Sequence, residues 1–394
     1  MKNKSLKPGW NWVKFGDVVR QCKDKVDPDN SELERYVAGD HMDTDDLRLR
    51  RWGEVGSGYL GPAFHIHFKP GQVLYGSRRT YLRKVAVADF EGICANTTFV
   101  LESKKNDYLL PEFLPFLMQT DNFNEYSVKN SKGSVNPYIN FSDLAEFEFA
   151  LPPIEKQLAA ITVIGAAKKQ CYTLEDTYLA SQMVLQAYKE NLFKWNKEST
   201  SYTLGELLLD SPKSGCSAPA QSEPTGHFVL GLSSLSRDGY ISGEFKSVNP
   251  TRKMLAAKLS AGDMLISRSN TVERVGYVGI FCDKRDDVSF PDTMMLLNPN
   301  PSLVLADFLE AILQTTYSRE YLMRIAAGTS ASMKKINRAN LLQMPLSIPS
   351  LDFQVASLKE LKRLKNTVTA QKLRWDGAQQ LAKLILSKTI EGEA

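Results

Sequence analysis

Two stretches of the chain decide the fold: Leu151-Pro-Pro-Ile-Glu-Lys-Gln157 and, 197 positions later, Ile348-Pro-Ser-Leu-Asp-Phe-Gln354. In each, proline stands where a helix can begin, because its fixed φ is compatible with the first helical turn. Glu155 or Asp352 then follows in the first turn, where the helix dipole favours a negative charge. About 40 residues without another proline come after each stretch. The sequence therefore predicts two long helices that begin at equivalent points of a repeat.

Weaker matches extend this repeat over both halves of the chain. Gly71-Gln-Val-Leu-Tyr75 resembles Gly262-Asp-Met-Leu-Ile266 at an offset of 191, and Ile139-Asn140 matches Ile336-Asn337 at 197. The order of the matches is kept and the offset drifts slowly, as insertions in loops would cause. We therefore predict an internal duplication.

Apolar residues in both long segments recur in steps of three and four, which is a heptad pattern. A helix of about 40 residues is about 60 Å long and needs a partner along its length. We expect the two helices to pair antiparallel as a coiled coil, with an approximate two-fold axis and a globular domain at each end. The alternative is that each helix packs on its own globular domain. The predicted interhelix seam comprises Ile164, Cys171, Leu174, Tyr178, Leu185 and Tyr188 in the first helix and Leu361, Leu364, Val368, Trp375 and Ile385 in the second.

The rest of each half is predicted to contain both strands and helices. Short apolar runs such as Val73-Leu-Tyr75 and Val85-Ala-Val87 predict strands, and Gly, Asn and Asp separate them. One helix is expected near residues 111–125 and its counterpart near 305–324. The predicted fold class is α/β (α+β), with two similar mixed domains joined by the long helices. The expected boundaries are 1–150 and 198–347 for the domains, and 151–197 and 348–394 for the helices.

Composition bounds the class of protein. The 394 residues are 43% hydrophobic and 24% charged, which is typical of globular proteins, and the net charge of +4 is too mild to indicate nucleic-acid binding by itself. The five cysteines contain no C-x-x-C pair, which argues against a disulfide scaffold or a zinc ribbon. No apolar run approaches the roughly 18 residues of a membrane span, and the N-terminus lacks the apolar region of a signal peptide. A soluble, cytoplasmic protein without a membrane partner is expected.

Several short patterns resemble enzyme motifs, but the neighbouring residues that these motifs require are absent. Gly56-Ser-Gly-Tyr-Leu-Gly61 fits G-x-G-x-x-G, but Pro62 follows at once and no acidic residue stands at the distance that a dinucleotide site requires. Asn136-Pro-Tyr138 resembles part of an amino-methyltransferase motif but lacks its second proline. His65 and His67 would lie on one face of a strand without a third ligand at a suitable spacing. We therefore expect no catalytic residues, no metal and no cofactor in this chain.

Basic residues cluster in loops at matched positions of the two halves. Arg, Lys, Ser and Asn are the side chains that contact phosphates and base edges of DNA. For any single residue, the alternative is a solvated charged loop. The candidate DNA-binding residues are Arg48, Arg50, Arg51, Arg78, Arg79, Arg83, Lys84, Lys129, Lys132 and Ser134 in the first half and Arg268, Ser269, Asn270, Arg274, Lys334, Lys335 and Arg338 in the second.

The combination of Gly133-Ser134, Ile139-Asn140 and Leu-Pro-x-Ile-Glu-x-Gln at 151–157, repeated over 328–354, resembles the specificity (S) subunits of type I restriction–modification systems. The resemblance covers essentially the whole chain. It implies two target-recognition domains that each read one part of a bipartite double-stranded DNA target. It also implies that the long helices space these domains and dock two methyltransferase (M) subunits, which restriction (R) subunits join. A non-catalytic role follows, because those partners would hold the cofactor, ATP and metal.

In this interpretation, phosphate contacts supply most of the affinity for DNA and a few base-edge contacts supply selectivity. Helix length would fix the gap between half-sites, as domain spacing does in dimeric DNA readers. Two alternatives stay open: a coiled-coil scaffold without DNA recognition, and a specificity chain of a methylation-only phage-defence system.

Overall fold

The computed structural model describes residues 6–192, 199–328 and 333–390. The chain divides into two compact units, Met1–Asp176 with Leu373–Ala394 (unit 1) and Thr177–Lys372 (unit 2). Each unit contains one globular part and a segment of both long helices, and the domain boundaries at 150 and 347 stay a prediction. The predicted boundary at 197/198, and Thr329 of the second sequence block, lie outside the described residues.

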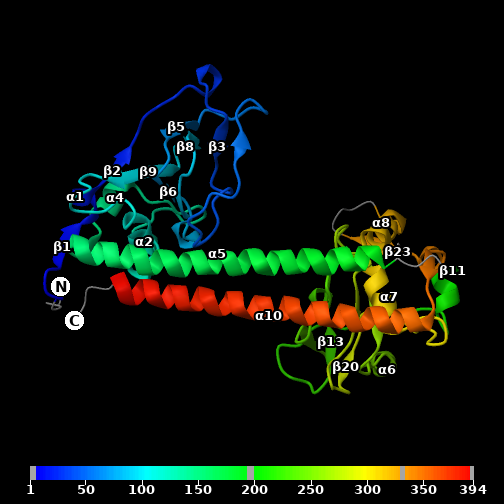
Figure 1. Cartoon of the computed structure of the whole chain (residues 1–394). Helices are drawn as coiled ribbons and strands as arrows, with labels where there is room; N and C mark the ends of the chain where they lie inside the picture. Colours follow the sequence, from blue (N-terminus) through cyan, green and yellow to red (C-terminus); the bar gives the residue numbers. More distant parts are fainter. Residues whose placement is uncertain (1–5, 193–198, 329–332, 391–394) are drawn as a thin grey trace. The chain divides into compact units, whose positions relative to one another are not determined.

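The two long helices are α5 (Ile154–Asn191) and α10 (Leu351–Ile390), which begin directly after the prolines as predicted (Figure 1, green and red). In unit 1, Ile164 of α5 and Leu386 of α10 belong to one buried core. In unit 2, Leu361 near the start of α10 belongs to the core that also holds the end of α5, and the Tyr188 hydroxyl donates to the Ser357 carbonyl at 3.2 Å. Within each unit, the two helix segments therefore run antiparallel and contact each other, while both also pack on the globular part.

Burial along α5 and α10 follows the heptad pattern. Every residue of the predicted seam is buried or partly buried, and Ile164, Cys171 and Leu361 are buried most completely. Lys372 of α10 also lies over the Tyr178 ring, 5.6 Å from its centroid. For the other residues of the predicted seam, contact with the opposite helix stays a prediction.

The globular part of unit 1 consists of two four-stranded sheets and one strand pair. The first sheet is antiparallel, and the second includes one parallel pairing, in which Tyr36 lies opposite Ile93. The first sheet has the order β2 (Val19–Cys22), β9 (Thr98–Ser103), β6 (Val73–Gly76), β7 (Val85–Val87), the second β4 (Gly53–Glu54), β3 (Arg35–Val37), β8 (Gly92–Ala95), β5 (Phe64–Phe68), and the pair is β1 (Asn11–Lys14) with β10 (Glu148–Leu151). The helices are α1 (Phe15–Val18), α2 (Leu114–Met118), α3 (Asp121–Lys129) and α4 (Phe141–Ala145), with 3-10 turns η1 (Pro28–Asn30) and η2 (Thr80–Leu82).

Unit 2 repeats this arrangement and adds small strands. Its parallel pairing places Phe228 opposite Val288, in the same topological position as in unit 1. Its four-stranded sheet has the order β12 (Lys213–Ser214), β21 (Met294–Leu297), β17 (Met264–Ser267), β19 (Val278–Ile280). Two three-stranded sheets have the orders β16 (Phe245–Ser247), β13 (Phe228–Leu230), β20 (Val288–Ser289) and β18 (Ser269–Asn270), β23 (Lys334–Ile336), β22 (Ala326–Ala327). Two strand pairs are formed by β11 (Thr200–Thr203) with β24 (Pro345–Ile348) and by β14 (Leu235–Ser236) with β15 (Gly239–Tyr240). The helices are α6 (Arg252–Leu255), α7 (Ala306–Leu313), α8 (Thr316–Ile325) and α9 (Arg338–Leu342), with 3-10 turns η3 (Leu204–Leu207) and η4 (Leu232–Ser234).

Equivalent elements keep the offsets of the sequence repeat. Strands β6 and β17 begin 191 positions apart, β10 and β24 begin 197 apart, and α3 and α8 begin 195 apart. The prediction of an internal duplication of mixed helix-and-sheet structure is confirmed.

The single helices predicted near 111–125 and 305–324 are each two shorter helices, so that prediction was wrong. The break falls at Thr120 in unit 1 and at Thr315 in unit 2. Each threonine hydroxyl accepts a hydrogen bond from a backbone N–H of the next helix, that of Phe123 at 3.3 Å and that of Ser318 at 3.4 Å. Such N-caps satisfy donors at the helix start and allow the chain to turn before α3 and α8. Across the described residues, no helix has the length and apolar character needed to cross a membrane.

Candidate nucleic-acid interface

In unit 1, two loops far apart in the sequence lie together: the one after β6 (residues 77–84) and the one after α3 (residues 130–138). Backbone bridges join Tyr138 to both Arg78 and Lys132. The Arg79 N–H donates to the Pro137 carbonyl at 2.6 Å, and its Nε donates to the Asn136 Oδ1 at 3.0 Å. This pairing brings five of the predicted residues onto one surface, which we call the unit 1 loop surface: Arg78, Arg79, Lys129, Lys132 and Ser134.

All five side chains are exposed, and two exposed aromatic residues lie among them. Tyr81 is 52% exposed and Tyr138 is 42% exposed. Arg79 and Arg83, which flank the 3-10 turn η2 that carries Tyr81, both adopt left-handed backbone conformations, with φ of 50° and 52°. Non-glycine residues adopt this region rarely, and such residues concentrate at functional sites. Lys132 pairs with the Asp143 carboxylate at 2.8 Å, so the surface offers Arg78, Arg79 and Lys129 as cations for phosphates and aromatic rings for sugars or bases.

In unit 2, the corresponding loops lie together through strand pairing. Ser269 of β18 lies opposite Lys335 of β23, and the Ile336 N–H donates to the Arg268 carbonyl at 2.9 Å. The Nη1 of Arg268 and the Nη2 of Arg338 each lie 3.4 Å from the Ser214 Oγ. We call the set formed by Ser214, Arg268, Arg274, Lys335 and Arg338 the unit 2 loop surface.

This second surface concentrates positive charge. In the part of the chain that the structure describes, neither Arg268 nor Arg338 has a carboxylate within 4.0 Å, and the buried Nε of Arg268 has no hydrogen-bond partner. Two guanidinium groups therefore converge on one hydroxyl, an arrangement that suits a negatively charged ligand. Ser214 was not predicted, because its position 54 residues before Arg268 gives no sequence signal.

Four predicted residues serve the fold in the structure. Ser269 and Asn270 are 5% and 7% exposed, and the Asn270 Oδ1 accepts from the Thr271 N–H at 2.9 Å. Because these two side chains lie inside the protein, we leave them out of the loop surface. The Lys334 ammonium donates to the Gly328 carbonyl of its own loop, and the Lys84 ammonium donates to the Gly39 carbonyl in the segment after β3.

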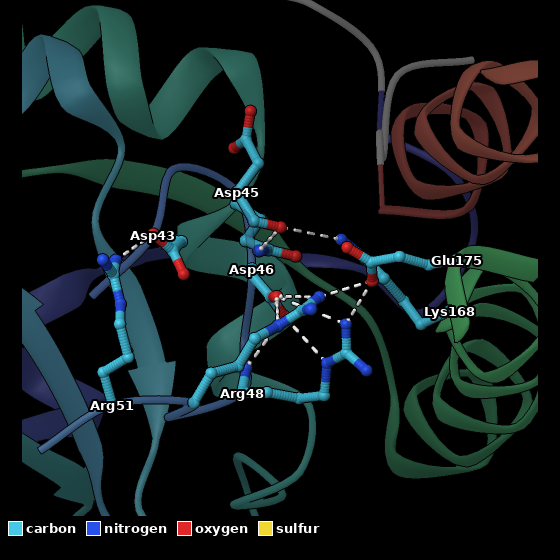
Figure 2. Close-up of polar contacts among 9 residues, drawn as sticks. Asp43, Asp45, Asp46, Arg48, Arg51, Lys168 and Glu175 are labelled. Atoms are coloured by element: carbon cyan, nitrogen blue, oxygen red, sulfur yellow. Dashed lines mark hydrogen bonds and ion pairs between the residues drawn. The ribbon is translucent and has the colours of Figure 1, made fainter. Parts of the chain in front are cut away.

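Arg48, Arg50 and Arg51, predicted to contact DNA, are paired with carboxylates, as Figure 2 shows for Arg48 and Arg51. The Arg48 Nη2 donates to the Glu175 Oε2 at 2.6 Å, and Arg50 donates to the same oxygen. Both arginines also pair with Asp46, at 3.3 and 2.7 Å.

The loop that carries these arginines therefore docks on helix α5. The Arg48 guanidinium also lies 3.5 Å from the centroid of the Tyr172 ring. Arg51 pairs with Asp43 at 2.5 Å, and 57% of its side chain is exposed, against 30% for Arg48. Burial raises the pKa of Glu175, and Arg50 opposes this shift. The geometry favours a structural role for Arg48 and Arg50 and leaves Arg51 accessible.

Arg83 is likewise held inside unit 1. Its side chain is 17% exposed, and it pairs with Asp45 at 2.7 Å and with Asp121 at 2.8 Å. Its Nη2 also donates to the Gln119 carbonyl at 2.6 Å. The Lys168 ammonium of α5 approaches the Asp45 carbonyl at 3.3 Å, as Figure 2 shows. Arg83 therefore joins the sheet loop to the start of α3.

His65 and His67, which were considered as metal ligands, contact a backbone carbonyl and a carboxylate. The His65 Nδ1 lies 3.0 Å from the Pro62 carbonyl, and the His67 Nε2 lies 2.7 Å from the Glu91 carboxylate. Among the described residues, no three His, Cys, Asp or Glu side chains are arranged to hold a metal ion.

Each unit of this repeated α/β chain thus has a basic loop surface after the equivalent strand, β6 or β17. Residues 45–176 match the family described as the type I restriction modification DNA specificity domain. The specificity subunit of the type I restriction enzyme EcoDI of Escherichia coli is 28% identical over 222 residues, which make up 51% of this chain and 47% of that protein. The chain thus spans about half the length of the curated relatives it matches.

Solved structures share the fold over the whole chain. A chain from a study of complex assembly and conformational transition in the type I restriction–modification system is 18% identical, with a TM-score of 0.63 over 99% of this chain and all of that one. The type I S subunit of M. genitalium is 14% identical, with a TM-score of 0.54 over 100% of this chain and 99% of that one. Residues 45–176 are therefore similar to the DNA specificity domain of type I restriction–modification systems, and about half of the chain is similar to a specificity subunit of such a system.

Proposed function

We propose that this chain is a non-catalytic DNA specificity subunit whose two globular parts each read one part of a bipartite target. The observation that carries the proposal is the position of the two loop surfaces. Each follows the equivalent strand of its unit, β6 or β17. In each, this loop pairs through its backbone with the segment that precedes α4 or α9. Because the fold is duplicated and both copies carry cations at the same place, each copy can bind its own part of a DNA target.

The two surfaces differ in chemistry, so we expect two different half-sites. Unit 1 combines Arg78 and Arg79 with the exposed rings of Tyr81 and Tyr138. Unit 2 instead places two arginines around a hydroxyl. Arginine side chains serve phosphates and guanine edges, whereas exposed rings contact sugars and unstacked bases.

The long helices are the proposed docking sites for two methyltransferase subunits, which restriction subunits would join. Both helices carry exposed apolar side chains that no core of their unit covers. Met183 of α5 is 73% exposed, Leu373 of α10 is 68% exposed and Val355 is 58% exposed. Exposed apolar groups of this kind favour a protein partner. The catalytic chemistry of methylation and cleavage would then belong to those partners, and double-stranded DNA would be the shared substrate.

Binding of labelled duplex DNA by this chain, assembled with its methyltransferase partner, tests the proposal. We expect salt-dependent binding that the double variant Arg78→Ala/Arg79→Ala weakens at least tenfold. Arg363→Ala is the matched control, because Arg363 is an exposed arginine of α10 that pairs with Glu360. Equal binding by both variants, or no binding by the assembled wild-type chain, would contradict the proposal and favour a scaffold without DNA recognition.

A further inference from the structure

Unit 2 contains a cavity of about 280 Å³ beside the start of helix α8. Its lining comes from the turn between β14 and β15, the segment before β19, and the first turns of α8. The lining residues on which the inference rests are Arg237, Glu273, Tyr277, Gln314, Thr316 and Arg319.

Two buried N–H donors of this lining have no hydrogen-bond partner within the described residues: the Nη1 of Arg319 and the Nε2 of Gln314. Gln314 is 3% exposed, and its Oε1 accepts a hydrogen bond from the buried Lys189 ammonium at 2.9 Å. The amide cannot be turned around, because its NH₂ group would then face the ammonium. A buried donor without a partner is costly, so both atoms favour an acceptor in the cavity.

In unit 1, a different arginine lies beside the equivalent helix. Next to the start of α3, the Arg83 guanidinium is held by the carboxylates of Asp45 and Asp121. Asp121 is the first residue of α3, and its equivalent 195 positions later, the first residue of α8, is Thr316. The second repeat therefore has no carboxylate at this helix position, and the Glu190 Oε1 instead accepts from the Thr316 N–H at 2.7 Å and from its hydroxyl at 2.9 Å.

In unit 2, the guanidinium of Arg319 contacts a backbone carbonyl and an aromatic ring and forms no ion pair with a carboxylate in the described residues. Its Nη2 donates to the Glu273 carbonyl at 3.0 Å, and its carbon lies 4.6 Å from the centroid of the Tyr277 ring. None of the ion pairs within 4.0 Å in the described chain involves Arg319. Burial lowers the pKa of Arg319, and the neighbouring Arg237 adds to this shift. Arg237 and Arg319 thus face one cavity, and within the described residues neither forms an ion pair within 4.0 Å with the Glu273 or Glu320 carboxylate that also lines it.

We propose that this cavity binds a phosphate group, whose oxygens would supply the acceptors that the buried donors of Arg319 and Gln314 lack. The N–H groups of Arg319 and Gln314 would donate to its oxygens, and Arg237 would contribute charge from the edge. Glu273 and Glu320 also line the cavity, but both are exposed, so solvent screens their charges more than it screens the buried donors.

The phosphate that we favour is one of the DNA backbone, an assignment that rests on the proposed function. The Glu273 carbonyl that Arg319 holds belongs to the same turn as the exposed Arg274 of the unit 2 loop surface. A phosphate in the cavity would therefore lie beside the predicted DNA contacts. Free inorganic phosphate offers the same chemistry and is the second source to test.

The first arm of the test measures thermal unfolding of the full chain in inorganic phosphate against chloride at equal ionic strength. The variants are Arg319→Gln and Arg237→Gln, and the control is Arg324→Gln, which removes the same charge from the exposed side of α8. We expect a saturable rise in Tm for the wild type and the control, and loss of this rise in both cavity variants. Arg237 is exposed on a turn, so its variant keeps the test informative if Arg319→Gln fails to fold.

The second arm measures DNA binding over a range of salt concentrations. The plot of log K against log salt falls with a slope of about −0.9 for each phosphate contact. We therefore expect the slope of Arg319→Gln to be shallower by about 0.9 than that of Arg324→Gln. A phosphate-dependent Tm rise with unchanged slopes would assign the cavity to free phosphate. Identical behaviour of cavity variants and control in both arms would overturn the cavity site and leave the DNA proposal intact. Failure of the wild-type chain to bind DNA would instead contradict the proposed function.

Discussion

Gln157 and Gln354, 197 positions apart, are both completely buried and make the same three hydrogen bonds in their two units. The Gln157 Oε1 accepts from the Leu110 N–H at 2.9 Å. Its Nε2 donates to the carbonyls of Tyr108 and Pro152, both at 2.9 Å. The first turn of α5 is thereby joined to the loop that precedes α2.

In unit 2, the Gln354 Oε1 accepts from the Leu305 N–H at 2.9 Å. Its Nε2 donates to the carbonyls of Leu303 at 3.0 Å and Pro349 at 2.9 Å. The glutamine that ends each copy of the repeated block is therefore a structural link between a long helix and its globular part, and it explains why the block recurs in both halves.

Replacing either glutamine should destabilise its unit. Gln157→Leu leaves three buried backbone groups without partners, and we expect the free energy of unfolding to fall by about 2–4 kcal/mol. Chemical denaturation measures this change. Gln170→Leu, at an exposed position of the same helix, is the control and should change the stability little. Equal stability of the two variants would show that the three hydrogen bonds do not hold the helix to its domain.

The Arg48–Glu175 and Arg50–Glu175 pairs should contribute to the docking of the 43–51 loop on α5. Glu175→Gln leaves two partly buried guanidinium groups with Asp46 as their remaining carboxylate, so we expect a loss of about 1–3 kcal/mol. Hydrogen exchange should show faster opening of residues 43–51. Glu155→Gln, in the exposed first turn of α5, serves as the control. Unchanged exchange in Glu175→Gln would contradict the docking role.

The position of Glu310 predicts a pH dependence of stability. This carboxyl is 6% exposed; burial raises its pKa, and Lys365 at 3.5 Å opposes the shift. The folded chain therefore keeps the Glu310 proton to higher pH than the unfolded chain. Its contribution to the free energy of unfolding falls as pH rises from about 4.5 through the folded pKa.

Glu310→Gln removes this titration, so the difference in unfolding free energy, wild type minus variant, should decrease between about pH 4 and pH 7. Denaturation at several pH values gives the difference directly. A difference that stays constant or grows with pH would show that Glu310 is already ionised across this range.

The proposed spacer role of the helices predicts the effect of a matched insertion. One added heptad between Asp176 and Thr177, and another between Lys372 and Leu373, keeps the seam in register and falls at the boundary of the units. Seven residues add about 10 Å of helix, which corresponds to about three base pairs of DNA. Mapping of methylated sites should show a longer unread spacer and unchanged half-sites. Altered half-sites with an unaltered spacer would exclude this role.

The sequence predicted the features that depend on local chemistry or on repetition. Proline placed the starts of α5 and α10, and the heptads gave the buried faces. The repeat offsets located equivalent strands before any contact was known. The loop pairs 77–84 and 130–138 were predicted separately as basic regions, but their association depends on the pairing of Arg78 with Tyr138 across the fold.

Features that depend on distant partners were not predictable in the same way. Arg48 and Glu175 are 127 positions apart, and the charge of a loop does not reveal which carboxylate will neutralise it. The breaks at Thr120 and Thr315 were missed because the apolar pattern continues across them, although a threonine before a polar stretch is a known helix-start signal. Burial of Ser269 follows from the pairing of β18 with β23, which the sequence around it does not indicate.

The central claim is that each repeat reads its own half-site through its loop surface, and genome-wide mapping of methylated adenines tests it most directly. Hosts would carry the wild-type chain, Arg78→Ala/Arg79→Ala, or Arg268→Ala/Arg338→Ala. We predict that each double variant relaxes the sequence of one half-site, a different one in each case, and leaves the other half-site and the spacer unchanged. Relaxation of both half-sites together by either variant, or an unchanged motif in both, would contradict the claim.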